Sequence, residues 1–123
     1  MREAWEQGTV LWGASAGMIC WFEQGVTDSF GPQLEGMDCL GFLPGSHSPH
    51  YDGEPERRPT YQRLVANGEL PPGYAADDGA ALVFRGTELA EVVAELPAAR
   101  GYRVERGPDG TAVETELATR FLG

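Results

Sequence analysis

"LWGASAGM", residues 11–18, places a serine between small residues, directly after an apolar run and directly before a stretch that favours a helix. Gly13, Ser15 and Gly17 form a Gly-x-Ser-x-Gly pattern. A sharp turn from a strand into a helix lifts a serine hydroxyl out at the end of the strand, and it aims free helix N–H groups at a reacting carbonyl. In that arrangement Ser15 is a candidate nucleophile and the N–H of Ala16 a candidate oxyanion donor. The alternative is structural, with Ser15 as a helix N-cap.

Length and charge limit the classes of protein to consider. The chain has 123 residues, which fits a single domain spanning 1–123. Its formal net charge of −10 would repel phosphate backbones and anionic lipid headgroups, so neither nucleic acid nor membrane is expected as a partner. Two cysteines without a CxxC pattern, and a charged N-terminus without an apolar leader, favour a cytoplasmic location.

The hydrophobic pattern predicts alternating elements. We expect helices over 2–7, 16–24 and 57–66, strands over 9–12 and 39–43, and a long loop over 26–38. The C-terminal part predicts a hairpin over 74–86, an element at 88–96 that could be helix or strand, and a second hairpin over 101–117. These elements indicate an α/β fold with antiparallel strands at one edge.

A serine nucleophile needs a base, and the chain has two histidines, both in "GSHSPHYDGE". This segment follows the second predicted strand, so it can lie at the carboxyl edge of the sheet. We favour His50 as the base because Tyr51 and Asp52 follow it in a polar loop. His47 is predicted to be an exposed loop residue. A zinc site on both histidines is disfavoured, since Pro49 prevents a helix that would present them together.

A third group should orient the imidazole of the base. Asp28 in "VTDSF" and Asp78 in "AADDGAAL" are the two candidates, and Glu54 is a weaker third. Both aspartates occupy turn-type positions, where a carboxylate that bonds only to the local backbone is the structural alternative. The residues by themselves leave the choice between Asp28 and Asp78 open.

Four ordered blocks resemble one known family. "GASAGM", "VTD", "SPHYDGEPERR" and "AADDGAALVFRG" are similar, in this order, to the S51 serine peptidases, which include dipeptidase E and, more distantly, cyanophycinase. The resemblance implies a doubly wound domain of the class I glutamine amidotransferase type, with no metal or organic cofactor. It also implies Ser15 as nucleophile and His50 as base. Asp28 matches the aspartate that dipeptidase E has after its Thr-rich loop, and Asp78 matches the residue that serves as the triad acid in cyanophycinase-like members.

The chain departs from the family in two ways. Dipeptidase E has Gly-Glu-Thr-Arg after its histidine, and that arginine holds the aspartate side chain of the substrate. Here the run is "GEPERR", so Arg57 and Arg58 are candidate substrate-binding residues, with a solvated helix start as the alternative. Family members are also considerably longer, and the match starts late in the family pattern. The chain therefore resembles the C-terminal part of the domain, without its first strands and one oxyanion donor.

The resemblance predicts a serine peptidase of the dipeptidase E type that hydrolyses short peptides. The loss of one oxyanion donor would make it weak rather than inactive. The alternative is a catalytically impaired S51-like fragment with a role in assembly. A parallel sheet without its first strands exposes an unpaired edge and an apolar face, so we also expect a homo-oligomer. A cyanophycinase-like activity is disfavoured, because a basic groove would need more basic residues than the nine present.

Overall fold

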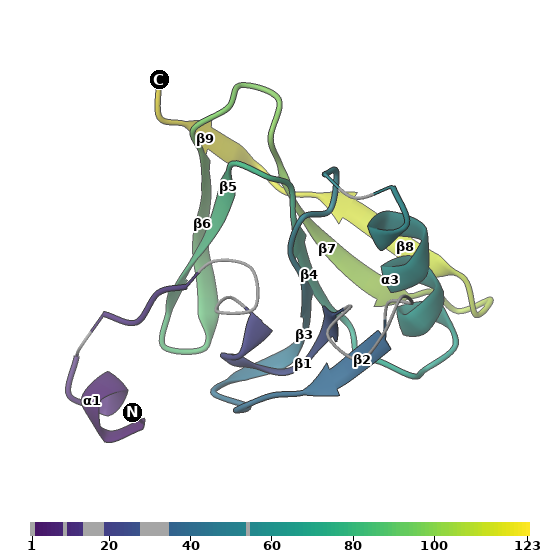
Figure 1. The fold of residues 1–123 in the computed structure, drawn as a ribbon, viewed down its shortest axis with the longest axis horizontal. Helices are drawn as coiled ribbons and strands as arrows, with labels where there is room; N and C mark the ends of the chain where they lie inside the picture. The colour runs from purple at the N-terminus through teal and green to yellow at the C-terminus, as the bar shows by residue number, and fades with distance from the viewer. Residues whose placement is uncertain (1, 9, 14–18, 28–34, 54) are drawn as a thin grey trace.

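The computed structural model describes residues 2–8, 10–13, 19–27, 35–53 and 55–123 (Figure 1). In chain order the elements are α1 (Arg2–Glu6), β1 (Phe22–Thr27), β2 (Glu35–Asp38), β3 (Leu43–Ser48), α3 (Arg57–Ala66), β4 (Gly73–Ala76), β5 (Ala80–Arg85), β6 (Glu88–Ala94), β7 (Gly101–Arg106), β8 (Ala112–Glu116) and β9 (Thr119–Phe121). The described chain is thus a mixed α/β structure that consists mostly of sheet. None of its described helices is long and apolar enough to cross a membrane.

The larger sheet has six strands in the order β2-β1-β3-β4-β7-β8 (Figure 1). Its centre is parallel, because β3 pairs in parallel with both β1 and β4. The outer pairs β1–β2, β4–β7 and β7–β8 are antiparallel. The prediction of antiparallel C-terminal strands at one edge is confirmed for β7 and β8.

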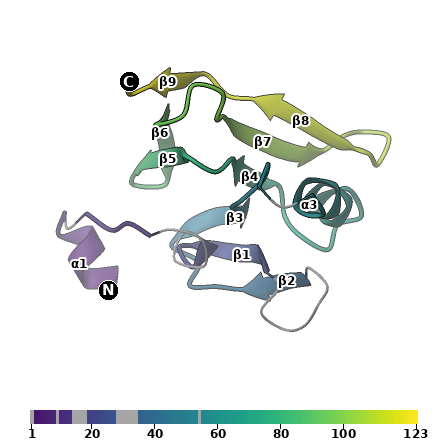
Figure 2. The same cartoon turned by 45° about the horizontal axis from the view of Figure 1, so that its top comes forward.

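The smaller sheet has three strands in the order β5-β6-β9 and lies beside the larger one (Figure 2). The predicted hairpin over 74–86 is therefore wrong, since β4 and β5 belong to different sheets. The reason is that β3 and β7 occupy both edges of β4 and leave no edge for β5. The element at 88–96, which the sequence left open, is the strand β6, and it pairs with β5 instead.

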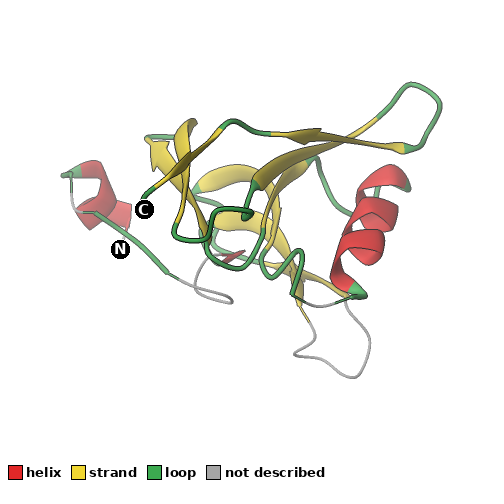
Figure 3. Ribbon diagram, turned by 90° about the horizontal axis from the view of Figure 1, so that it is seen from above, coloured by secondary structure: helices red, strands yellow, loops and turns green. Residues whose placement is uncertain are grey.

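Helix α3 covers one face of the larger sheet, against β7 and β8 (Figure 3). The helix predicted over 57–66 is confirmed. Its apolar side chains Tyr61, Leu64 and Val65 are buried, and they join the main core. The helix ends at Asn67 and Gly68, and Gly68 has a positive φ of 83°, as glycines at helix ends often do. The hairpin predicted over 101–117 is also confirmed, with β7 and β8 joined by a turn at 107–110.

Several predictions for the N-terminal third are wrong. The segment 10–12, expected in a strand, is in no sheet, and the side chains of Val10 and Trp12 are each 83% exposed. The end of the helix expected over 16–24 is strand β1, because pairing with β2 and β3 satisfies its backbone on both sides. The loop expected over 26–38 contains β2, and the strand expected over 39–43 begins only at Leu43.

Strands β3 and β4 approach each other closely where β4 begins, at Ser46 and Gly73. A Cβ on Gly73 would lie 1.9 Å from the carbonyl oxygen of Ser46, so only glycine lets the two strands approach here. The Ser46 hydroxyl bonds to the Tyr61 hydroxyl at 2.7 Å and donates to the Pro71 carbonyl at 2.7 Å. These bonds tie α3 and the turn before β4 to β3.

Candidate active site

The candidate site lies where the two central parallel strands end. His50 comes two residues after the end of β3, and Asp78 comes two residues after the end of β4. The register pairs Ser48 with Ala75, so the two strands end side by side. Because the carboxyl ends of neighbouring parallel strands meet at one edge of a sheet, the residues that follow them are brought together.

His50 and Asp78 form a direct pair at this edge. Nδ1 of His50 lies 2.7 Å from Oδ1 of Asp78, and the two side chains are 36% and 52% exposed. A neutral imidazole that donates Nδ1–H to a carboxylate has Nε2 as its acceptor. This geometry is the one that a base and its orienting acid have in a nucleophilic triad. The structure brings His50 together with Asp78, one of the two acids between which the sequence left the choice open.

The backbone of His50 adopts an uncommon conformation. Its φ is +53°, the only positive value among the described residues other than glycine. A side chain in the left-handed region costs free energy and persists only where the surroundings enforce it. Here the Gly53 N–H donates to the carbonyl of His50 at 3.2 Å, and the Tyr51 N–H donates to Ala76 at 3.0 Å. The conformation turns the chain sharply after Pro49, directly at the end of β3.

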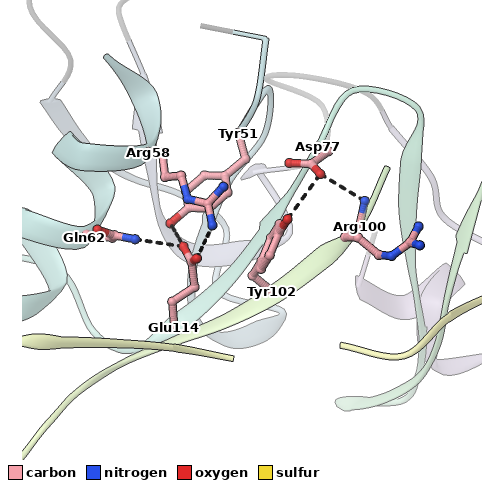
Figure 4. Close-up of polar contacts among 7 residues, drawn as sticks. All are labelled: Tyr51, Arg58, Gln62, Asp77, Arg100, Tyr102 and Glu114. Atoms are coloured by element: carbon pink, nitrogen blue, oxygen red, sulfur yellow. Dashed lines mark hydrogen bonds and ion pairs between the residues drawn. The ribbon is translucent and has the colours of Figure 1, made fainter. Parts of the chain in front are cut away.

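Tyr51, which follows His50, belongs to a polar cluster with side chains from α3 and β8 (Figure 4). Arg58 donates to Glu114, and its guanidinium stacks over the rings of Tyr51 and Tyr102 at 5.2 and 4.9 Å. Glu114 also accepts from the Tyr51 hydroxyl at 2.5 Å and from Gln62 at 2.9 Å. Burial alone would raise the pKa of Glu114, but these donors hold it below its ordinary value. The cluster fixes Tyr51, the residue that follows His50.

The two candidate substrate-binding arginines lie in different surroundings. Arg57 is 4% exposed, and its Nη1 donates to the carbonyl of Val26 in β1 at 2.6 Å. The Arg58 side chain is 44% exposed, although it is engaged with Glu114. Arg57 therefore links α3 to the sheet from inside, while Arg58 is the one that a ligand in solvent can reach.

Asp77 and Asp78 are neighbours with different environments. Asp77 is buried, and its Oδ2 accepts the Arg100 N–H at 3.0 Å and the Tyr102 hydroxyl at 3.5 Å (Figure 4). Burial raises the pKa of Asp77. It anchors the turn to β7, and Asp78 alone of the two faces His50. Sequence reasoning missed Asp77, Tyr51 and Glu114, because their roles depend on contacts with β7, β8 and α3.

The prediction that His47 is an exposed loop residue is wrong. His47 lies inside β3, is 0% exposed, and stacks on Phe22 with ring centroids 5.0 Å apart. The strand continues three residues beyond Gly45, farther than the Pro-Gly signal indicated, and pairing with β1 and β4 buries it. His47 and His50 thus have separate surroundings. Among the described residues, no three His, Cys, Asp or Glu side chains converge as they would around a metal ion.

His47 is expected to make the fold sensitive to acid. Burial, the largest cause, and the charge of Arg57 lower the pKa of His47 from 6.5 to about 3. Between these values the unfolded chain binds a proton that the folded chain excludes. The free energy of unfolding should therefore fall as the pH drops through this range, by up to about 1.4 kcal/mol per pH unit. In urea unfolding measured from neutral pH down to this pKa, the free energy of unfolding should fall less steeply in His47→Leu than in the wild-type protein. Equal slopes in both proteins would contradict the assignment.

An apolar cavity of about 490 Å³ opens between the N-terminal segment and the two sheets. Its wall includes the aromatic residues Trp5, Trp12, Trp21, Phe22, Phe42 and Phe84. Gly13, also in the wall, immediately precedes the segment that carries the candidate nucleophile. Ser15 and Ala16, with the other candidate acid Asp28, lie outside the described residues.

The described chain is a mixed α/β structure with a His–Asp pair at the carboxyl edge of its parallel strands, and comparison with known proteins gives its family. Residues 1–92 match the model of peptidase family S51, and the chain belongs to this family. The chain is 52% identical over its whole length to a protein of Bacillus subtilis (strain 168) named "Uncharacterized peptidase YgaJ". It spans about half of that relative, 53% of its length. No solved structure matches the chain.

Proposed function

We propose that this protein is a serine-type peptidase that hydrolyses short peptides in the manner of dipeptidase E. The observation that carries the proposal is the 2.7 Å pair between His50 and Asp78 at the carboxyl edge of the parallel strands. Membership of a peptidase family and the name of the Bacillus relative support peptide-bond hydrolysis. We assign the role of nucleophile to Ser15, in the Gly-x-Ser-x-Gly pattern that precedes β1.

The proposed reaction follows the roles of a nucleophilic triad. Nε2 of His50 takes the proton of the Ser15 hydroxyl as its oxygen attacks the peptide carbonyl. The N–H of Ala16 stabilises the resulting oxyanion, and protonated His50 then gives the proton to the leaving amine. Water, activated by the same imidazole, releases the acyl group from Ser15. Asp78 holds Nδ1–H and stabilises the imidazolium in both steps.

For the substrate, we propose that Arg58 rather than Arg57 meets a carboxylate of the peptide, such as an N-terminal aspartate side chain. The solvent-facing position of Arg58 supports this choice. For the fold, we propose the class I glutamine amidotransferase type for the family domain, in keeping with the parallel centre of the larger sheet. A cytoplasmic location, suggested by the two cysteines without a CxxC pattern, belongs to the same proposal.

We also propose that the chain forms a homo-oligomer. Val10 and Trp12 are each 83% exposed beside the aromatic cavity, and apolar surface of this kind favours burial against a second protein surface. A monomer in sedimentation velocity measurements would contradict this part of the proposal.

A fluorophosphonate probe tests the proposed function, because it forms a covalent bond only with an activated serine. We expect the purified chain to be labelled at Ser15 and Ser15→Ala to be unlabelled. The outcome that would contradict the proposal is a folded protein that the probe does not modify. That result would favour the alternative, an S51-like chain with impaired catalysis and a role in assembly.

A further inference from the structure

The loop after β3 and the turn after β4 are hydrogen-bonded to each other, and each segment donates to the other. The Tyr51 N–H donates to the carbonyl of Ala76 at 3.0 Å, and the Asp78 N–H donates to Oδ1 of Asp52 at 2.7 Å. The side-chain pair between His50 and Asp78 is the third connection. Each segment therefore supplies a side chain to the other, and neither can shift alone without breaking a bond.

Gly53 supplies space to the same carboxylate. A Cβ on Gly53 would lie 2.0 Å from Oδ2 of Asp78 and 3.0 Å from its Cγ, far inside contact distance. Gly53 does not adopt a positive φ, so the glycine is required for room rather than for backbone conformation. Oδ1 of Asp78 faces His50, and Oδ2 occupies the position next to Gly53.

We propose that Asp52 and Gly53 are positioning residues for the His50–Asp78 pair. Asp52 fixes the backbone N–H of Asp78, and Gly53 leaves the space in which the Asp78 carboxylate can face Nδ1. This control is needed because both partners are substantially exposed, and a polar pair in contact with solvent holds its own geometry weakly. The catalytic consequence rests on the proposed function, whereas the structural consequence can be measured without any activity.

The tautomer of the His50 imidazole, read from long-range ¹H–¹⁵N NMR spectra, tests the proposal directly. Neutral His50 should carry its proton on Nδ1 in the wild-type chain. Asp52→Ala and Gly53→Ala should each shift it towards the Nε2–H form. Asp52→Asn keeps an oxygen that can accept the Asp78 N–H, so it should retain the wild-type tautomer. The chain has only two histidines, and the signals of buried His47 report whether each variant is folded.

Two matched controls come from the β7–β8 turn. Asp109 accepts the backbone N–H of Thr111 at 3.1 Å, and a Cβ on Gly107 would meet a methyl group of Val113 at 2.9 Å. Asp109→Ala therefore removes the same kind of hydrogen bond as Asp52→Ala, and Gly107→Ala adds a methyl group in a tight space as Gly53→Ala does. Both changes lie away from the site and should leave the His50 tautomer unchanged. The proposal is overturned if folded Asp52→Ala and Gly53→Ala keep the Nδ1–H form. If Gly53→Ala does not fold, the comparison of the His50 tautomer in Asp52→Ala and in Asp52→Asn tests the proposal.

Labelling of Ser15 by the fluorophosphonate probe separates this proposal from the proposed function. Asp52→Ala should slow labelling by at least about 10-fold. The upper limit is about 10⁴-fold, which is the effect of losing tautomer control in a triad. A changed tautomer in a protein whose wild type is never labelled would support positioning and refute the peptidase. Unchanged tautomer and labelling in Asp52→Ala, with an active wild type, would refute positioning alone.

Discussion

Replacing His50 should reduce peptide hydrolysis and fluorophosphonate labelling by roughly 10⁴-fold or more, to the level of Ser15→Ala. Without the imidazole, no group is assigned to take the proton of the Ser15 hydroxyl, and a serine hydroxyl is a weak nucleophile. The other histidine cannot substitute, because His47 is fully buried in β3. Comparison of the initial labelling rates of wild type, His50→Gly and Ser15→Ala measures the effect.

Stability separates this loss from unfolding. His50 has a φ of +53°, a conformation that glycine adopts readily and alanine does not. His50→Gly should therefore be more stable than His50→Ala by roughly 1 kcal/mol in urea unfolding, while both are inactive. Turnover that survives in folded His50→Gly would show that another group is the base.

Asp78→Asn is expected to have the second-largest effect, a loss of up to about 10⁴-fold in the rate of labelling or hydrolysis. The change keeps the shape of the side chain but replaces the carboxylate that faces Nδ1 of His50 at 2.7 Å. An amide in that position can favour the wrong tautomer and cannot stabilise an imidazolium as a carboxylate does.

Asp28→Asn is the matched variant, since it makes the same chemical change at the other candidate acid. We expect it to lower the rate by less than about 10-fold, because no orienting role is left for a second acid once Asp78 holds Nδ1. The reverse pattern, with Asp28→Asn inactive and Asp78→Asn near wild type, would assign the orienting role to Asp28.

Local sequence signals predicted part of the fold correctly. The helix over 57–66 has its stop signal, Asn67-Gly68, directly after it, and the hairpin over 101–117 has a Gly-Pro-Asp-Gly turn between alternating strands. In both cases the contacts that define the element lie close in the sequence. The prediction of a helix over 16–24 was wrong where β1 begins. The helix-like spacing there was overruled by pairing with β2 and β3, which come later in the chain.

The residues of the candidate site were also predicted only in part from local sequence signals. Histidine scarcity and the polar residues around His50 singled it out, and Asp78 was one of two acids that local pattern could not separate. His50 and Asp78 are 28 positions apart, and the β3–β4 register brings them together. The burial of His47 and Arg57, and the support of Tyr51 by Glu114, depend on partners distant in the sequence.

The sequence alone determined the family resemblance, the charge, the helix and hairpin with local stop signals, and a short list of chemically suitable side chains. Only the tertiary structure decided that β4 and β5 separate into two sheets, that His47 is buried, and that Asp78 faces His50. The physical reason is that turn and capping preferences act between near neighbours, whereas strand pairing and burial are chosen by competition among all the segments that can share an edge or a core.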